Sequence, residues 1–125
     1  IYESKINKRN YINLWGDRKT KRELIYVDDL AEASIYFLFK KTKKNLINIG
    51  TQKDFTIEYY AKKIMKILDI KLKIKYINKN LKGTPRKKLD CSLATNLGWR
   101  PKIKIDKGLE LSIKDFIENY KQYTK

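Results

Sequence analysis

The sequence predicts a single domain of mixed α/β (α+β) structure covering residues 1–125. Three observations support this fold class. The length of 125 residues lies within the roughly 100–200 residues of one domain. Short runs of alternating apolar and polar residues are interspersed with segments whose apolar residues recur at helical spacing. The richest apolar run, Ile35–Phe39, is far shorter than the roughly 18 residues that cross a membrane, so we expect no membrane segment.

The first third of the chain predicts strands followed by a helix. The residues from Ile1 onward are expected to enter a strand at once, and Tyr11–Trp15 and Arg22–Val27 are further strands of β-favouring residues. Asp28 and Asp29 precede the helix and would cap it, because carboxylates accept from the free amides of a first turn. An acid pair or metal site is the alternative, but adjacent side chains at a helix start point apart.

The middle of the chain predicts a strand, a helix and another strand. Leu46–Ile49 is expected to be a brief strand. Thr56 is expected to cap the helix 57–68, which has the clearest apolar stripe in the chain. Leu72–Tyr76 alternates with lysines and therefore predicts a strand with one wet face, followed by a polar loop, Asn78–Lys82.

The last third predicts two helices. Asp90 or Ser92 is expected to cap a short helix that runs through Leu97, and Gly98 takes the position just after its end. Apolar residues at helical spacing predict a terminal helix from Asp106 to Tyr120.

Several kinds of active site are excluded by composition. The chain has no histidine, so it offers no imidazole base. It has one cysteine, Cys91, which excludes a thiolate zinc cluster and an internal disulfide. We therefore expect a reducing, cytoplasmic setting. No Gly-rich dinucleotide loop or P-loop is present. The Tyr-x-x-x-Lys spacings at Tyr36…Lys40 and Tyr59…Lys63 lack such a loop, and we interpret them as chance matches.

The formal net charge of +16 raises the hypothesis of a basic nucleic-acid-binding module, because cations neutralise backbone phosphates. The lysines are spread along the chain rather than gathered in one stripe, which favours a solvated surface instead. A structural or partner-binding domain is a third hypothesis.

Two segments could form a binding site. Trp15 ends a strand and Arg22 opens the next, so an apolar ring suited to a sugar and a planar cation suited to phosphate could converge. Gly83–Lys88 combines a glycine, a proline and adjacent cations in one loop. Either segment alone is compatible with an exposed basic turn.

Six segments occur in a characteristic order: Trp15-Gly16, Arg22–Ala31, Ile47–Thr51, Asp54–Ile57, Gly83–Asp90 and Leu97–Pro101. Together they resemble the C-terminal portion of the GDP-L-fucose synthase family, which belongs to the extended short-chain dehydrogenase/reductases. The Arg-Glu-x-x-x-Val-Asp-Asp block is shared widely among nucleotide-sugar epimerases and dehydratases. Gly-Thr-Pro-Arg-Lys narrows the resemblance to the GDP-fucose synthase branch.

The resemblance implies the small substrate-binding domain of a longer enzyme, without its N-terminal Rossmann domain. That missing domain would bind NADP and carry the catalytic groups, so this chain alone is expected to be inactive and to hold no catalytic, cofactor or metal residue. The implied reaction deprotonates GDP-4-keto-6-deoxy-mannose beside its keto group, reprotonates C3 and C5, and reduces C4 with NADPH. The implied partners are the GDP-sugar, the chain's own Rossmann domain and a second copy in a homodimer.

The resemblance also implies substrate-binding roles for four residues: Trp15, Arg22, Arg86 and Lys87. Two features depart from the family pattern. Lys82 replaces the usual acidic residue, and the turn Asp17–Lys19 replaces a small, neutral one. Another GDP-sugar, such as a 6-deoxy-heptose, is therefore the alternative substrate. Cys91 falls where the family has a small apolar residue and is not its catalytic cysteine.

Overall fold

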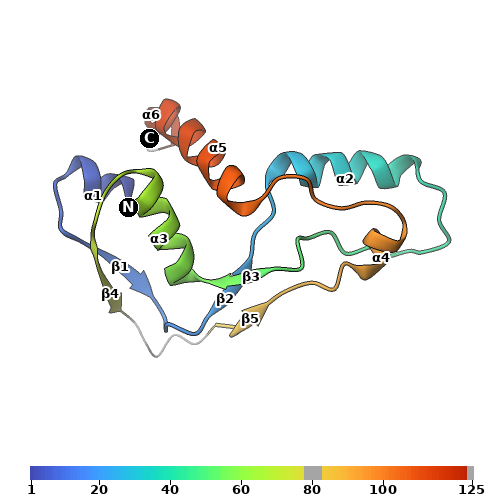
Figure 1. Ribbon diagram of the computed structural model, residues 1–125, viewed down its shortest axis with the longest axis horizontal. Coiled ribbons are helices and arrows are strands. Elements are labelled where there is room, and N and C mark those ends of the chain that lie inside the picture. The colour runs from blue at the N-terminus through green and yellow to red at the C-terminus, as the bar shows by residue number, and fades with distance from the viewer. Residues whose placement is uncertain (78–82, 124–125) are drawn as a thin grey trace.

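The computed structural model describes residues 1–77 and 83–123, and these ranges confirm the mixed α/β class (Figure 1). They contain six helices and five strands. In chain order these are α1 (Tyr2–Ile6), β1 (Tyr11–Trp15), β2 (Lys21–Glu23), α2 (Val27–Phe39), β3 (Asp54–Thr56), α3 (Ile57–Ile67), β4 (Lys73–Ile77), β5 (Arg86–Lys87), α4 (Ser92–Asn96), α5 (Ile105–Glu118) and α6 (Tyr120–Tyr123). None of these helices is both long and apolar enough to cross a membrane.

The strands form two small sheets. In the first, β1 and β4 run parallel, with Tyr11 opposite Lys73 and Trp15 opposite Ile77. In the second, the order is β3-β2-β5, where β2 is antiparallel to β3 and parallel to β5. The carboxyl end of β1 points toward the second sheet, which lies near the middle of the elongated molecule (Figure 1).

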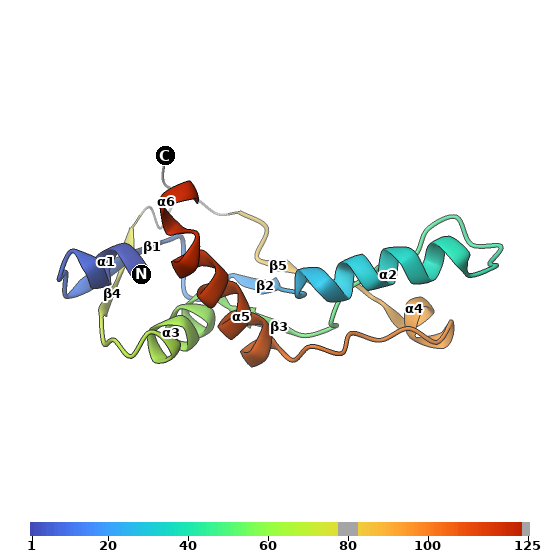
Figure 2. The ribbon, with the colours of Figure 1, turned by 90° about the horizontal axis from the view of Figure 1, so that it is seen from above.

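The helices divide between the two ends of the molecule. Helices α1, α3 and α5 gather beside the first sheet, whereas α2 and α4 form the opposite end (Figure 2). An ion pair of 2.7 Å between Lys63 Nζ and Asp106 Oδ1 joins α3 to α5. At the far end, Ala33, Ala94 and Trp99 form a buried cluster, and five half-buried residues pack against it: Ile25, Tyr36, Phe37, Ile47 and Ile49.

The expected strand at the start of the chain is wrong, because Tyr2–Ile6 form helix α1. The helix places the Tyr2 ring edge-on against Phe116 and Tyr120, at centroid distances of 5.8 and 5.0 Å. Lys5 Nζ also donates to the carbonyl of Leu68 at 2.5 Å. Contacts with α3 and the C-terminal helices therefore fix this segment, and its own sequence pattern does not reveal them.

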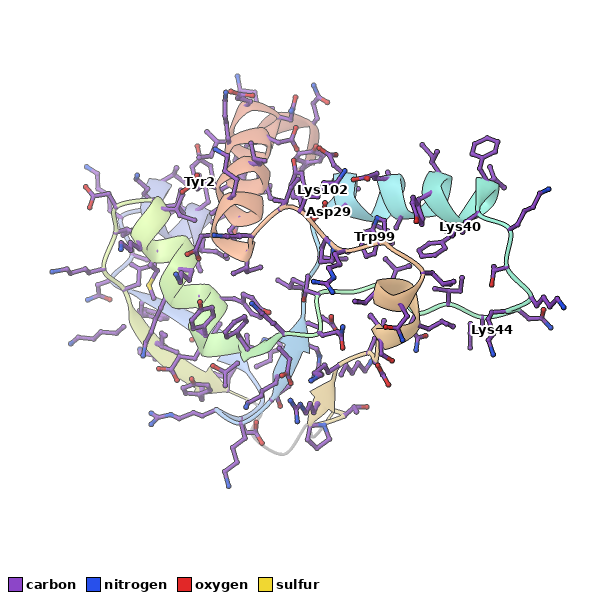
Figure 3. The ribbon with its side chains drawn as sticks, turned by 45° about the vertical axis from the view of Figure 1, so that its right-hand side comes forward. Tyr2, Asp29, Lys40, Lys44, Trp99 and Lys102 are labelled. Atoms are coloured by element: carbon purple, nitrogen blue, oxygen red, sulfur yellow. The ribbon has the colours of Figure 1, made fainter. Side chains whose placement is uncertain are left out.

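The expected strand Arg22–Val27 is too long, and the capping role of Asp28 and Asp29 is wrong. Strand β2 ends at Glu23, and α2 begins at Val27 with Tyr26 as a cap residue that makes no side-chain cap bond. Asp29 is 2% exposed, and its two carboxylate oxygens accept from the backbone amides of Lys102 (3.1 Å) and Ile103 (2.9 Å). Figure 3 shows Asp29 facing the segment that carries Lys102.

The expected strand Leu46–Ile49 is also wrong. Its residues belong to the irregular connection between α2 and β3, in which Ile47 and Ile49 pack against the Trp99 cluster. Asn48 Nδ2 donates to the carbonyl of Asp90 at 3.1 Å, a single side-chain bond in place of a backbone ladder. Leu46 is 78% exposed, whereas Ile47 and Ile49 are half-buried, and among the described residues none of the three has a strand partner.

Other predictions are confirmed. The Thr56 hydroxyl accepts from the amide of Tyr59 at 3.1 Å at the start of α3, the lysine-alternating segment forms β4, and the terminal helix forms α5. Gly98 follows α4 with φ of 99°, a conformation that favours glycine.

The expected cap at Asp90 or Ser92 is wrong: Cys91 is the cap residue of α4 and makes no side-chain cap bond, and Ser92 is the first residue of the helix. Asp90 precedes the cap residue, and its Oδ1 accepts from the amide of Ser92 at 2.9 Å. The predicted loop Asn78–Lys82 lies outside the described residues.

Candidate functional site

Arg22 and Lys87 are neighbours across the parallel pair β2–β5. Residues paired in this way direct their side chains to the same face of a sheet, since side chains alternate along each strand. Lys87 is exposed, and no described residue forms an ion pair with it. Arg22 and Lys87 are 65 residues apart in sequence, and the pairing of β2 with β5 places these two cations side by side.

The Arg22 guanidinium is held by the loop that leads into β5. Its Nη1 donates to the carbonyls of Lys21 at 2.6 Å and Thr84 at 2.9 Å. The Arg22 carbonyl accepts from the Tyr60 hydroxyl at 2.8 Å, which fixes the backbone from the other side. Nε and Nη2 have no partner among the described residues, so two donors of the planar fork remain for an anion.

Arg86 lies on the opposite face from Arg22 and Lys87. Its Nε and Nη2 donate to the Asp54 carboxylate at 2.5 and 2.9 Å, a bidentate pair. These bonds to the guanidinium hold the pKa of Asp54 below its usual range. Arg86 thereby ties β5 to β3 across β2, and only Nη1 remains without a partner among the described residues.

Trp15 ends β1 and is 70% exposed. The next residue, Gly16, has φ of 85° and donates its amide to the carbonyl of Ile77 at 3.0 Å, so the chain turns sharply away from the first sheet. The turn then leads directly into β2 and Arg22. Trp15 and Arg22 therefore stand on different sheets, at the two ends of one short connection.

The turn after Trp15 is ordered by its own polar residues. Asp17 Oδ1 accepts from the amides of Lys19 (2.9 Å) and Thr20 (2.8 Å) and from the Thr20 hydroxyl (2.9 Å). These bonds lower the pKa of Asp17, the Thr20 hydroxyl contributing most. Arg18 Cζ lies 5.1 Å from the centroid of the Tyr76 ring. Of the cations gained in this turn, Arg18 is therefore engaged with β4.

Tyr76 links this turn to α3. Its hydroxyl donates to Glu58, and burial together with that carboxylate raises the pKa of Tyr76 to about 12. Glu58 also pairs with Lys62 Nζ at 2.7 Å, and its pKa is lowered by that ammonium and by the Tyr76 hydroxyl. The phenol is thus a structural donor to a carboxylate.

Glu23 is a site-building residue that sequence analysis missed. Its Oε1 accepts from the amide of Gln52 at 2.6 Å and the Thr51 hydroxyl at 3.2 Å, and its Oε2 accepts from the amide of Leu89 at 2.8 Å. The signal that the sequence offers is the position of Glu23 directly after Arg22 in the Arg-Glu-x-x-x-Val-Asp-Asp block. Nothing in that block indicates which distant amides the carboxylate would meet.

The two Tyr-x-x-x-Lys spacings are occupied by structural contacts. The Tyr36 hydroxyl donates to the carbonyl of Leu97 at 2.9 Å, and Lys40 Nζ lies 5.6 Å from the Tyr36 ring centroid. Lys63 pairs with Asp106 on α5 and lies 5.5 Å from the Tyr59 ring centroid. Both spacings thus serve contacts within this chain.

Cys91 is 2% exposed, and burial raises the pKa of its thiol, with the Glu23 and Asp90 carboxylates adding to the effect. A buried thiol of raised pKa is a weak nucleophile. Within the described ranges, no three His, Cys, Asp or Glu side chains are placed to share a metal ion.

Comparisons with known proteins bear on what this arrangement serves. The NAD dependent epimerase/dehydratase family model matches residues 2–50. A GDP-L-fucose synthase of Escherichia coli (strain K12) is 34% identical over 88% of this chain and 37% of its own length. A GDP-L-colitose synthase of Yersinia pseudotuberculosis is 33% identical over 87% of this chain and 36% of its own.

A similar structure is that of a GDP-6-OMe-4-keto-L-xylo-heptose reductase from Campylobacter jejuni. The two superpose with a TM-score of 0.77 at 27% identity, over 94% of this chain and 38% of the other. The chain spans a little over a third of the length of the relatives that it matches.

Proposed function

The chain belongs to the NAD-dependent epimerase/dehydratase family of the extended short-chain dehydrogenase/reductases, and from that membership we propose that it forms the substrate-binding part of a GDP-sugar epimerase-reductase. The observation that carries the proposal is the register pairing of Arg22 with Lys87. Two cations on one face match the charge of a nucleoside diphosphate. Like charges directly opposite in a sheet destabilise it, and a bound pyrophosphate would offset that repulsion.

The two cations suit different contacts with the pyrophosphate. Arg22 offers two donors in one plane, a geometry that matches two phosphate oxygens, whereas Lys87 acts as a point charge on a flexible stem. The exposed indole of Trp15 offers an apolar face beside the same connection, which suits a sugar ring. We assign the phosphates to Arg22 and Lys87 and the sugar to Trp15. The role of Arg86 toward substrate stays a prediction and would have to use its Nη1.

NADP does not fit the residues of this chain. A dinucleotide site requires a Gly-rich turn between a strand and a helix. Two described strands lead into a long helix: β2 reaches α2 through Leu24-Ile25-Tyr26, and β3 continues directly into α3. Neither junction contains a glycine. We therefore propose that NADP and the catalytic groups belong to the portion that the relatives possess beyond the matched third. The described residues bind and orient the substrate.

The outer face of α2 suits contact with that further portion. Apolar residues surround this helix, and a helix that is apolar on all sides is normally buried. Its inner side packs on the Trp99 cluster, yet five apolar residues are exposed on the other side: Val27, Leu30, Ile35, Leu38 and Phe39. We propose that a Rossmann domain of the same protein covers them. A homodimer and a cytoplasmic location stay predictions.

The sugar follows from analogy with the relatives. GDP-4-keto-6-deoxy-mannose is the substrate we propose, converted to GDP-L-fucose, since GDP-L-fucose synthases are among the relatives. A GDP-heptose is the alternative that the similarity to a heptose reductase supports. The cations of the turn 17–19 adjoin the sugar side of the site, and Lys19 remains free of ion pairs there among the described residues.

The test is calorimetric titration of GDP into the protein at its natural full length. Because a hydrogen bond to a charged group contributes about 1.5–3 kcal/mol, Arg22→Ala should weaken GDP binding by roughly ten- to a hundredfold. Arg9→Ala, which removes an equal charge before β1, is the matched control and should leave the affinity unchanged. Unchanged affinity of Arg22→Ala would remove Arg22 from the site, and absence of GDP binding by the unmodified protein would overturn the proposal.

A nucleic-acid-binding module is the second candidate, favoured by the net charge of +16. It predicts affinity for random oligonucleotides that falls steeply as salt rises. Thermal protection by GDP at moderate salt, together with no response to oligonucleotides, would exclude it.

A further inference from the structure

We propose that Glu23 is a positioning residue that fixes the spacing between Arg22 and Lys87, a role that rests on the proposed function. The carboxylate joins its own strand, β2, to two segments that are remote in sequence: the connection at 51–52 and the segment after β5. Each of these segments borders the cation pair or supports the strand that carries it.

The ladder between β2 and β5 is short. Only two residue pairs join these strands, Lys21 with Arg86 and Arg22 with Lys87. A two-residue parallel pairing offers few backbone bonds to hold its register. The bond from the Leu89 amide to Glu23 Oε2, at 2.8 Å, attaches the chain again just beyond the ladder. Lys87 is therefore fixed to β2 both at its own position and two residues later.

The backbone around Glu23 leaves little room for its carboxylate. A Cβ at Gly50 would lie 2.5 Å from Glu23 Oε1 and 3.2 Å from Cys91 Sγ, so only glycine leaves room for the carboxylate. Gln52, whose amide donates to the same oxygen, has φ of 57°, a left-handed conformation that costs a non-glycine residue energy. A glycine and a strained turn are thus both arranged around this one oxygen.

Glu23 lies on the face of the sheet opposite the cation pair. It follows Arg22 directly in β2, so its side chain points to the opposite face, the face on which Arg86 and Asp54 meet. Glu23 therefore cannot contact a ligand held by Arg22 and Lys87. Its influence on binding must pass through the backbone of β2 and β5.

The test is a double-mutant cycle on GDP affinity, measured on the natural full-length protein well below its unfolding temperature. Glu23→Gln keeps the shape but replaces one of the two accepting oxygens with an NH2 group that faces a donor, and we expect it to weaken GDP binding about tenfold. The matched control is Glu3→Gln on α1, exposed and outside the site, which should not change the affinity. Thr51→Val is the milder second variant: it removes the hydroxyl that donates to Glu23 and that also bonds the backbone of Leu24 and Lys53, and a twofold to threefold loss is expected.

The coupling to Lys87 separates positioning from general stability. In the otherwise unmodified protein, Lys87→Ala should weaken GDP binding about tenfold. In the Glu23→Gln background the same substitution should weaken it less than threefold, because Glu23→Gln has already moved the Lys87 ammonium out of alignment with Arg22. Additive losses would overturn the positioning role, as would unchanged affinity in both Glu23→Gln and Thr51→Val. If the unmodified protein bound no GDP, the proposed function itself would fail, a result distinct from either.

Discussion

At the residue scale, the neighbours of each side chain decide what it can do. Asp28 and Asp29 are adjacent acidic residues in the first turn of α2, yet Asp28 is exposed and Asp29 is buried. The buried Asp29 carboxylate accepts hydrogen bonds from two backbone amides of the segment that leads into α5. Asp29 therefore joins α2 to the C-terminal part of the chain, whereas Asp28 acts only through its charge at the positive end of the helix.

This contrast gives a prediction on stability. Asp29→Asn replaces one carboxylate oxygen with an NH2 group, which cannot accept a hydrogen bond. The backbone N–H of Lys102 or Ile103 is then left unsatisfied. The free energy of unfolding, measured by urea denaturation, should fall by about 2–3 kcal/mol. Asp28→Ala should lower it by no more than about 1 kcal/mol, the size of an exposed charge–dipole interaction. Equal losses in the two variants would contradict the anchoring role of Asp29.

The family resemblance predicts four site residues, and the spacing of apolar and polar residues along the chain would not have identified any of them. Trp15, Arg22, Arg86 and Lys87 differ in their neighbours, and those neighbours come from elsewhere in the chain. Arg86 and Lys87 are adjacent in sequence, but strand alternation directs them to opposite faces, one toward Asp54 and one toward the face shared with Arg22. The two-residue strand that causes this separation is too short to be recognised from the sequence.

At the element scale, prediction succeeded where a segment's own pattern decides its structure. β4 alternates lysines with apolar residues and was predictable, as was α3 with its apolar stripe and its Thr56 cap. Leu46–Ile49 has an equally apolar pattern, but whether such a run becomes a strand depends on a partner edge. Here its isoleucines pack against side chains instead. The short pairing of β2 with β3 and β5 likewise depends on chain segments that are distant in sequence.

The bidentate contact between β3 and β5 gives a pH prediction at this scale. Arg86 lowers the pKa of Asp54 in the folded protein below the value of 3.8 that an unfolded chain would show. A depressed folded-state pKa contributes stability that is fully present above about pH 5 and is lost as pH falls through the folded-state pKa. We expect Asp54→Asn to flatten the decline of the thermal midpoint below about pH 4, because its side chain does not titrate.

The matched control for that measurement is Asp106→Asn on α5, whose carboxylate pairs with Lys63 away from the second sheet. GDP affinity near pH 7 offers an independent readout, since loosening β5 should also disturb Lys87. A midpoint that declines with acid as steeply in Asp54→Asn as in the unmodified protein would show that this pair does not contribute to acid sensitivity.

At the scale of the whole molecule, the arrangement separates two tasks. Strands β2 and β5 lie near the centre of the elongated molecule, and α2 extends to one end (Figure 1). The two strands carry the cation pair, and apolar residues on the outer side of α2 are exposed. Leu38 and Phe39 are 76% and 79% exposed, on a helix whose opposite side is already packed. Exposure of this kind across one face is typical of a surface that another domain covers.

The proposed cover can be tested by one substitution in two contexts. In the isolated 125-residue chain, Leu38→Gln should change the free energy of unfolding by no more than about 0.5 kcal/mol, as for an ordinary surface site. In the natural full-length protein the same substitution should lower it by about 1.5–3 kcal/mol, because burying a leucine side chain contributes that much. Lys44→Gln, in the irregular connection after α2, is the control and should be neutral in both. Equal, small effects of Leu38→Gln in the two contexts would mean that the face stays open to solvent and that the proposed Rossmann domain does not cover it.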